Sequence, residues 1–258
     1  MSNILEQIVI LYEDEHILAI NKPAGLMVHA DGRSKGPFLT DWVLAKYPEA
    51  KDVGDPARTE EGEALDRSGI VHRLDKETSG VLLVAKTQKG FEHLKEQFKD
   101  RTLTKKYLAF VWGEMGEEFG TINRPIGRSK NDFRKWSAQR GTRGETREAE
   151  TYWTRMAVID AHSFGQLSGE KRLPVSFVQC EPKTGRTHQL RVHFNAIHHP
   201  VVGDFLYAQN KPFALGFHRT ALHANWIQFQ NVEGKVIKIV APLPEDFKRV
   251  VEHFAIKI

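Results

Sequence analysis

The chain has 258 residues, 40% of them hydrophobic and 27% charged, which is enough apolar material for a substantial folded core. It contains no apolar run as long as a membrane span and lacks the basic-then-apolar start of a signal peptide. The single cysteine, Cys180, has no CxxC partner, so we expect a small core residue in a cytoplasmic protein. The net charge of +4 favours a polyanionic partner only weakly.

The first half of the chain shows clear periodicity. Residues 8–12 and 17–20 flank a polar turn, which predicts a β-hairpin that ends at the Pro and Gly of residues 21–25. Apolar residues at helical spacing predict a short amphipathic helix over residues 39–47. Thr87 can cap a second helix. The inward face of that helix would carry Phe91, Leu94 and Phe98.

The second half is richer in strand-forming residues than in helical patterns. We expect strands over residues 103–112 and 174–180, a helix over 187–197, a closing hairpin of 226–229 with 236–240, and a last helix over 244–255. Strands outnumber helices and are joined by hairpin-length turns. The sequence therefore predicts an α+β fold, with a mixed, mostly antiparallel central β-sheet flanked by helices in one domain of residues 1–258.

Eight basic residues and two acidic ones fall between positions 124 and 147, which we call the basic segment, and Phe133 and Trp136 lie among them. Cations interleaved with aromatic residues suit a mobile loop that binds phosphates and stacks on bases. The alternative is a solvated surface insertion. Residues 49–69 are acidic in contrast, with Pro and Gly, and predict a flexible loop. The candidate nucleic-acid contacts are Arg128, Arg134, Lys135 and Arg140.

The most informative segment is the polar stretch of residues 72–80, which interrupts a strand-like pattern between Ile70-Val71 and the apolar residues 81–85. Asp75 lies at the edge of that pattern, with Arg73 two residues before it. A carboxylate placed there is partly desolvated and needs a charged partner. Asp75 is therefore a candidate for catalysis, and the alternative is a structural ion pair that closes a turn.

Two further segments are too polar for their apolar surroundings. Tyr107 lies in a predicted strand and either packs in the core or lines a cleft beside Asp75, where its ring would stack on a base and its hydroxyl would transfer a proton. Arg186 and Arg191 flank a Gly turn and a helix start, where both can bind anionic groups, and Arg191 could pair with Asp75. The alternative for these two is ordinary surface arginine.

The chain has 12 histidines, several of them in its C-terminal half, which raises the question of a metal site. It contains no HExxH motif, and His193, His198 and His199 do not have a recognised ligand spacing. We expect structural or RNA-contacting histidines and no metal.

Together these segments resemble the RluA-like group of RNA pseudouridine synthases, which act on ribosomal large-subunit RNA and tRNA. Six motifs follow the family's order between about residues 8 and 240. They are residues 21–29, 72–80, 106–109 and 184–193, Gly203-Asp204 with Tyr207, and residues 222–224.

The resemblance implies the pseudouridine synthase fold and isomerisation of uridine to pseudouridine in RNA, with no metal, nucleotide or redox cofactor. Asp75 matches the family's essential aspartate, and Tyr107 matches the tyrosine that packs on the base and takes the C5 proton. Arg191 matches the arginine paired with the aspartate, and Arg73 matches a residue near the flipped-out nucleotide. The same motifs add His72, Arg186, His188 and Leu222 as substrate or RNA contacts.

Elementary chemistry agrees with these assignments. A glycosidic bond that breaks and re-forms needs a carboxylate to stabilise or trap the oxocarbenium-like sugar carbon, as in retaining glycosidases. The pocket must exclude water, so we expect it to be apolar. Attack of Asp75 on C1′ and removal of a sugar proton both remain open.

Larger relatives carry an N-terminal S4-type RNA-binding domain, and too few residues precede the first predicted strand here to form one. We therefore expect the catalytic domain, chiefly the basic segment, to bind ribosomal RNA, tRNA or both, as a monomer with no obligate protein partner. Two alternatives make different predictions. A non-catalytic RNA-binding relative would lack Asp75 or Tyr107, and a His-dependent metallohydrolase would hold stoichiometric zinc.

Replacing Arg134, Lys135 and Arg140 together with Ala should weaken RNA binding and flatten its salt dependence, because each phosphate contact releases a counterion. Filter binding across a salt series measures both quantities. Unchanged affinity with an unchanged slope would remove the basic segment as an RNA contact.

Overall fold

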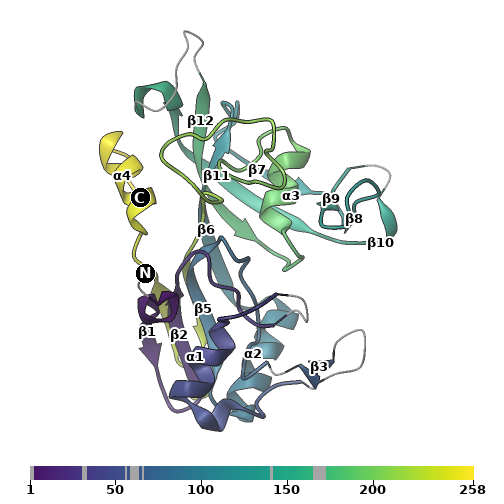
Figure 1. Cartoon of the computed structure of the whole chain (residues 1–258), viewed down its shortest axis with the longest axis vertical. Coiled ribbons are helices and arrows are strands. Elements are labelled where there is room, and N and C mark those ends of the chain that lie inside the picture. The colour runs from purple at the N-terminus through teal and green to yellow at the C-terminus, as the bar shows by residue number, and fades with distance from the viewer. Residues whose placement is uncertain are drawn as a thin grey trace. The chain divides into compact units, whose positions relative to one another are not determined.

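Two compact units divide the chain in the computed structural model, which describes residues 3–30, 34–55, 57–58, 64–65, 67–139, 142–164 and 173–258 (Figure 1). Unit 1 comprises Met1–Lys105 and Ala224–Pro242, and unit 2 comprises Lys106–His223 and Leu243–Ile258. The chain passes between the units inside strand β6 (Thr104–Trp112), inside strand β13 (Leu222–Gln230), and again before helix α4 (Glu245–His253).

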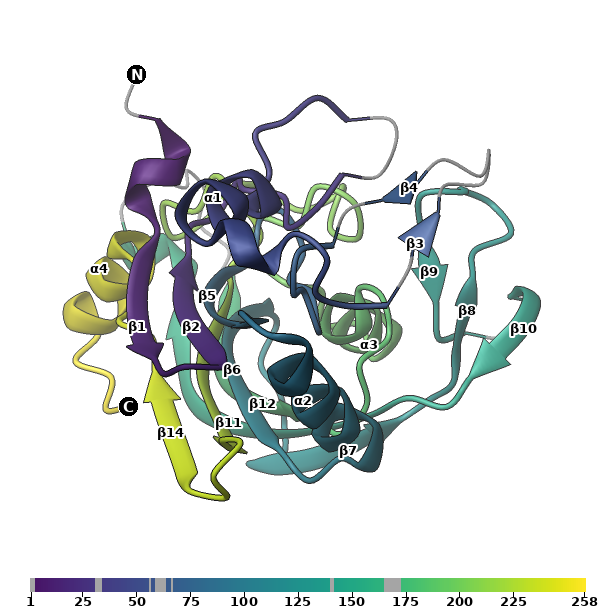
Figure 2. The same ribbon diagram turned by 90° about the horizontal axis from the view of Figure 1, so that it is seen from below.

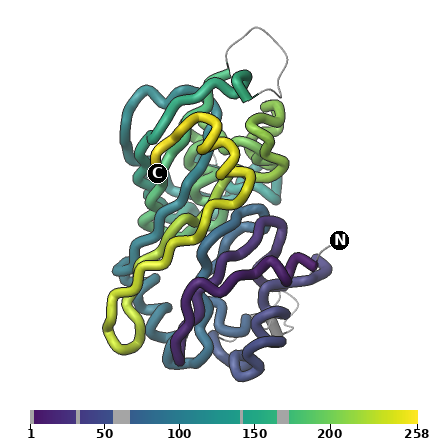
Figure 3. Tube along the Cα trace, turned by 90° about the vertical axis from the view of Figure 1, so that its left-hand side faces the viewer, coloured from purple at the N-terminus to yellow at the C-terminus, as the bar shows by residue number. Residues whose placement is uncertain are grey.

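Unit 1 is built on strands in the order β1-β2-β5-β13, with β14 paired to β13. The predicted hairpins are confirmed at both ends of this order, as β1–β2 and as β13–β14 (Figure 3). Strand β5 lies between β2 and β13 and is buried along its whole length. The further elements of unit 1 are η1 (Ile4–Gln7), β1 (Val9–Glu13), β2 (Ile17–Lys22), α1 (Leu39–Lys46), η2 (Pro48–Ala50), β3 (Ala57–Arg58), β4 (Ala64–Leu65), β5 (Ser79–Ala85), α2 (Gln88–Asp100) and β14 (Val236–Val240).

Local side chains explain where these elements begin. In the β1–β2 turn the Asp14 carboxylate accepts hydrogen bonds from the backbone N–H groups of His16 at 2.8 Å and Ile17 at 2.7 Å. Thr87 caps α2 as predicted, because its hydroxyl accepts the N–H of Gly90 at 3.2 Å. Of the strand-like pattern on either side of residues 72–80, only the part after them forms a strand, β5, while Ile70 makes an isolated bridge to Val84.

Unit 2 is built on strands in the order β6-β12-β11-β7. Its centre is aromatic: the ring of Phe110 lies 4.6 Å from that of Phe177, 5.4 Å from Phe217 and 5.3 Å from Phe247 on α4. Fully buried aromatic rings of this size dominate the energetics of a core. The further elements of unit 2 are β7 (Phe119–Asn123), β8 (Ile126–Arg128), β9 (Trp136–Ser137), β10 (Arg143–Arg147), β11 (Glu150–Asp160), η3 (Ala161–Phe164), β12 (Pro174–Pro182) and α3 (Gln189–Ala196).

The basic segment is more regular than the sequence suggested. We predicted a mobile loop, but β8, β9 and β10 form a small antiparallel sheet in the order β10-β8-β9 (Figure 2). The segment therefore presents its cations from a framework of backbone hydrogen bonds. Within the acidic stretch of residues 49–69, positions 56, 59–63 and 66 lie outside the described residues.

These strand pairings are antiparallel, with helices beside the strands, and they confirm the predicted α+β class. The grouping of both units into one domain of residues 1–258 stays a prediction. Within the described ranges, none of the helices combines the length and the apolar character needed to cross a bilayer.

His193 on α3 is a structural histidine in unit 2. It is fully buried, and its Nε2 lies 3.0 Å from the carbonyl oxygen of Arg124 while its Nδ1 lies 2.9 Å from the hydroxyl of Thr151. Because a carbonyl only accepts, Nε2 carries the proton and Nδ1 accepts from Thr151. Burial lowers the pKa of His193 to about 4, so the ring is neutral in the folded protein.

Gly80 on β5 should not tolerate a side chain. Its φ is +113°, and a Cβ there would lie 2.2 Å from the carbonyl oxygen of Ala224 on β13. Gly80→Ala should therefore lower the free energy of unfolding by roughly 2–4 kcal/mol in urea titrations. The control is Gly116→Ala, where nothing lies within 4 Å, and an equal loss in both variants would contradict this account.

His193 should make the fold sensitive to acid. Its pKa is about 4 when folded and about 6.5 when unfolded, so the unfolded chain binds the extra proton between these values. The stabilisation is present above pH ~6.5 and is lost as the pH falls towards ~4. Relative to wild type, His193→Gln should flatten the decline in unfolding free energy by on the order of 2 kcal/mol across this window. Denaturant titrations at several pH values measure it, and parallel curves would exclude the effect.

Candidate active site

Asp75 lies in a tight turn of unit 1 that leads into β5. The turn is anchored by Leu74, which is 4% exposed, and the backbone carbonyl of Asp75 accepts the N–H of Thr78 at 3.1 Å. The Asp75 side chain itself is half-buried. The sequence correctly placed this carboxylate next to a fully buried strand, where its ionised form is partly desolvated.

A buried lysine, Lys22, holds the chain in place immediately after Asp75. Lys22 has no exposed surface, and its ammonium donates to the carbonyls of Pro23 at 2.8 Å, Leu26 at 2.8 Å and Lys76 at 3.2 Å. The N–H of Gly25 also donates to the Lys76 carbonyl at 2.8 Å. A buried ammonium is tolerated only when its protons are used in hydrogen bonds. Lys22 therefore ties the segment of residues 21–29 to the residue that follows Asp75.

The sequence pattern alone gives no role to Lys22, although Lys22 lies in the motif of residues 21–29. The signal in the sequence is weak, because Lys22 follows Asn21 at the end of β2 and comes immediately before a Pro. Its burial follows from the fold, in which Lys22 lies opposite Gly80 in the β2–β5 pairing.

His72 supports β5 from the other side of the same turn. Its Nε2 accepts the N–H of Leu83 at 2.9 Å, and its ring lies 4.7 Å from that of Phe98 on α2. Burial, with a smaller contribution from the charge of Lys105, lowers the pKa of His72 to about 3. The predicted RNA-contacting histidine is thus neutral and hydrogen-bonded to the sheet.

Lys105 ends unit 1 and is itself perturbed. Its ammonium lies 5.6 Å from the centre of the Phe98 ring, and burial together with the charge of Arg101 lowers its pKa to about 8. The Lys105 ammonium therefore loses part of its proton occupancy at mildly alkaline pH, unlike an ordinary lysine.

Arg73 points to the surface of unit 1. It is exposed, and its guanidinium lies 3.5 Å from Nε2 of His29, so two of the predicted motifs meet at this point. Its contact with a flipped-out nucleotide stays a prediction.

Tyr107 and Leu222 both adjoin the core of unit 2. Tyr107 on β6 is opposite Cys180 on β12, and its half-buried ring packs against the core cluster that includes Leu222, which is 4% exposed. Cys180 is a buried free thiol whose pKa is raised by burial, which confirms the predicted core residue. The roles of Tyr107 and Leu222 towards a substrate stay predictions.

Arg191 on α3 is bound by a partner that the sequence did not reveal. Its Nε and one terminal nitrogen donate to the two carboxylate oxygens of Asp204, at 2.6 Å and 2.9 Å. Arg191 is 9% exposed and the Asp204 side chain is fully buried. Bidentate pairs of this kind are strong and fix the guanidinium plane. The predicted pairing of Arg191 with Asp75 stays a prediction.

The turn after Asp204 completes the surroundings of Arg191. The N–H groups of Leu206 and Tyr207 donate to the same Asp204 oxygen, at 2.9 Å and 3.0 Å. The ring of Tyr207 lies 5.1 Å from the Arg191 guanidinium carbon, a cation–π distance. At the start of α3, Nδ1 of His188 lies 3.0 Å from the Tyr207 hydroxyl.

Arg186 is held close to its own turn. Its Nε donates to the carbonyl of Glu148 at 3.0 Å, and its N–H donates to the side chain of Gln189 at 3.0 Å. These bonds place the guanidinium beside the end of the basic segment.

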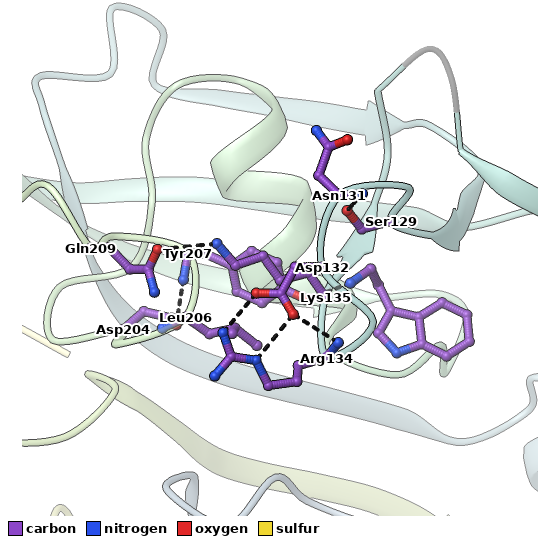
Figure 4. A network of polar contacts seen from close by, with 10 residues as sticks. Ser129, Asn131, Asp132, Arg134, Lys135, Asp204, Leu206, Tyr207 and Gln209 are labelled. Atoms are coloured by element: carbon purple, nitrogen blue, oxygen red, sulfur yellow. Dashed lines mark hydrogen bonds and ion pairs between the residues drawn. The ribbon is translucent and has the colours of Figure 1, made fainter.

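The cations of the basic segment differ in their surroundings (Figure 4). Arg134 forms a bidentate pair with Asp132 at 3.0 Å and 2.8 Å, and this pair lowers the pKa of Asp132 to about 2. Lys135 reaches Gln209 at 3.3 Å, and the guanidinium of Arg128 lies 4.3 Å from the ring of Trp136. Arg140 lies outside the described residues.

The histidines give no sign of a metal centre in the part of the chain that is described. Among those residues, no three His, Cys, Asp or Glu side chains lie together in a way that could hold an ion. Both nitrogens of His193 are engaged, and Nδ1 of His199 lies 2.8 Å from the carbonyl of Trp112. These two are structural histidines.

Comparison with known proteins identifies the family. The model of a family described as RNA pseudouridylate synthase matches residues 16–196. An uncharacterized RNA pseudouridine synthase of Synechocystis is 35% identical over 250 residues, which cover 96% of this chain and 69% of that protein. Ribosomal large subunit pseudouridine synthase D of Xanthomonas campestris is 36% identical, over 93% of this chain and 67% of that protein.

A solved structure agrees. The human RNA pseudouridylate synthase domain containing 1 superposes with a TM-score of 0.69 at 27% identity, over 95% of this chain and 86% of that one. Since the family match spans more than half of the chain and relatives above 30% identity are covered over two thirds of their length, this chain belongs to the RNA pseudouridylate synthase family.

Proposed function

We propose that this chain isomerises uridine to pseudouridine in RNA with Asp75, Tyr107 and Arg191 as its catalytic residues. The observation that carries the proposal is the turn of Asp75, half-buried before β5 and fixed through Lys76 by the buried ammonium of Lys22. A carboxylate held in one place and partly removed from water suits attack or charge stabilisation at a sugar carbon.

In the proposed reaction the C1′–N1 bond breaks and its electron pair goes to N1 of uracil. The Asp75 carboxylate stabilises the electron-poor sugar, either by bonding to C1′ or by removing a sugar proton. The uracil then turns and C5 forms the new bond to C1′, while the Asp75–C1′ bond breaks or the sugar proton returns from Asp75. The proton lost from C5 equals the one gained at N1, so the reaction needs no cofactor, and the phenolic oxygen of Tyr107, once its own proton has passed towards N1, is the proposed acceptor at C5.

Arg191 supplies the positive charge in this scheme. Its guanidinium is immobilised by Asp204 and by the ring of Tyr207, so its direction is set before the substrate arrives. Preorganised charge of this kind lowers a barrier because it does not reorganise during the reaction. We propose that it keeps Asp75 ionised.

The RNA target proposed is ribosomal large-subunit RNA, with tRNA as the second candidate. The support is the name of the Xanthomonas relative, which shares 36% identity over 93% of this chain. The basic segment and Arg186 would bind the phosphates and Arg73 would fill the place of the extruded nucleotide. We further propose a cytoplasmic monomer that needs no protein partner, and the free thiol of Cys180 fits such a reducing compartment.

Asp75→Asn should abolish pseudouridine formation, by at least ~1,000-fold, because the amide keeps the shape of the carboxylate without its charge or nucleophilicity. Single-turnover assays on transcribed large-subunit RNA, followed by carbodiimide mapping, measure the rate and the site. RNA affinity and thermal unfolding should change little.

The matched control is Asp55→Asn, since Asp55 is exposed and pairs with the exposed Lys95. It should retain full activity. Substantial activity in Asp75→Asn would refute the assigned role of this carboxylate, whereas an inactive wild-type protein on every RNA tried would refute the proposed function itself.

A further inference from the structure

Tyr207 contacts three parts of unit 2 that the proposed reaction needs together. Its hydroxyl accepts the backbone N–H of Trp136 in the basic segment at 2.9 Å. The same hydroxyl lies 3.0 Å from Nδ1 of His188, the residue that precedes α3. The face of its ring lies 5.1 Å from the guanidinium of Arg191, within the first turn of that helix.

Tyr207 is itself held by the ion pair that it covers. Its N–H donates at 3.0 Å to the Asp204 oxygen that binds a terminal nitrogen of Arg191 at 2.9 Å. The ring of Tyr207 therefore contacts the Arg191 guanidinium directly, and its backbone N–H contacts the Asp204 carboxylate that binds the same guanidinium. A displacement of Tyr207 must disturb the direction of Arg191, because close-packed side chains transmit strain.

The basic segment contacts the turn of residues 204–209 through two hydrogen bonds. One is the bond from the Trp136 N–H to the Tyr207 hydroxyl at 2.9 Å. The other is the contact of Lys135 with Gln209 at 3.3 Å (Figure 4). Trp136 also carries Arg128 over its ring at 4.3 Å. Arg128 is thus linked to Arg191 by three successive contacts that run through Trp136 and Tyr207.

We propose that Tyr207 is a positioning residue that couples RNA binding by the basic segment to the orientation of Arg191. The coupling has two separable parts. The hydroxyl holds the basic segment in register, so it governs RNA binding, and the ring holds the guanidinium, so it governs the chemical step. This inference rests on the proposed function and adds a residue to its machinery.

The two parts can be separated by two substitutions. Tyr207→Phe keeps the ring and removes the hydroxyl with its contacts to Trp136 and His188. Loss of the bond to the Trp136 N–H, which holds the basic segment, corresponds to roughly a 3- to 10-fold rise in KM for RNA, with kcat within about twofold. Tyr207→Leu removes the ring as well, so kcat should also fall by about 10-fold or more. A merely structural tyrosine would not split KM from kcat in this way.

Salt dependence supplies a second readout. Tyr207→Phe removes no charge but releases the segment that presents Arg128, so the slope of log affinity against log salt should fall by less than one phosphate contact, whereas Arg128→Ala should reduce the slope by about one. The double variant Tyr207→Phe/Arg128→Ala should lose less RNA affinity than the two single losses added together, because a basic segment released from Tyr207 already presents Arg128 poorly.

Controls and failure are distinguishable. The matched control is Tyr152→Phe, since Tyr152 is half-exposed on β11 against Lys183 and should leave KM and kcat unchanged. If Tyr207→Phe folds poorly by thermal melting, Gln209→Ala removes the second contact and should raise KM by roughly two- to threefold with kcat unchanged.

RNA affinities are also measured in the Asp75→Asn background, where turnover plays no part. An affinity loss in Tyr207→Phe there supports the link even if wild type shows no pseudouridine formation, which would refute only the proposed function. Two results would overturn the inference while the function stands. One is a wild-type KM in both Tyr207→Phe and Gln209→Ala, and the other is a fall in kcat in Tyr207→Phe by the same factor as the rise in KM.

Discussion

The pairing of Arg191 with Asp204 is the interaction on which the rest of unit 2's site depends. Burying a guanidinium or a carboxylate alone is strongly unfavourable, and removing one partner of a buried pair typically costs about 3–5 kcal/mol. The two groups meet through paired bonds of 2.6 Å and 2.9 Å, and Asp204 also accepts two backbone N–H groups. These bonds hold helix α3 against the turn that follows Asp204. The Tyr207 hydroxyl, which accepts the N–H of Trp136, connects that turn to the basic segment.

Unit 1 also contains a buried positive charge, but there backbone carbonyls stabilise it instead of a carboxylate. Its buried cation is Lys22, whose ammonium is satisfied by carbonyl oxygens on both sides of a chain reversal and on the turn of Asp75. In each unit a buried positive charge is thus bound to acceptors that include one more than ten residues away in sequence, Lys76 for Lys22 and Asp204 for Arg191. Small displacements of a desolvated charge are costly in free energy, because they leave the charge without its hydrogen-bond partners.

The sequence predicted well those elements whose burial follows a local period. The hairpin of β1 and β2 and the capped helix α2 have such patterns, and both were found where expected. Strand β11 was missed because its place is decided by pairing with distant chain, as in the register of Trp153 with Cys180. Strand β10 has no buried face at all, so its residues carry no alternation to detect.

For the candidate site, the motifs predict roles for Asp75, Tyr107 and Arg191 but do not show which contacts hold Arg191 and the turn of Asp75. The partner of Arg191 lies 13 residues away, and the carbonyl of Lys76 lies 54 residues from Lys22. Neither separation has a period that a sequence pattern can show. The residue types were visible, whereas the contacts that give them a role depend on the folded chain.

The discontinuity of unit 1 has a consequence for how the protein is made. Unit 1 needs both Met1–Lys105 and Ala224–Pro242, and its buried strand β5 lies between β2 and β13. During synthesis β5 therefore waits, with one hydrogen-bonding edge open and apolar, until more than a hundred further residues have left the ribosome. The whole of unit 2's sheet is translated in this interval, so it can form first. The unit that carries Asp75 is begun first, but its sheet is completed only after the sheet of unit 2 has been translated. A nascent chain halted before β13 would expose a template for aggregation.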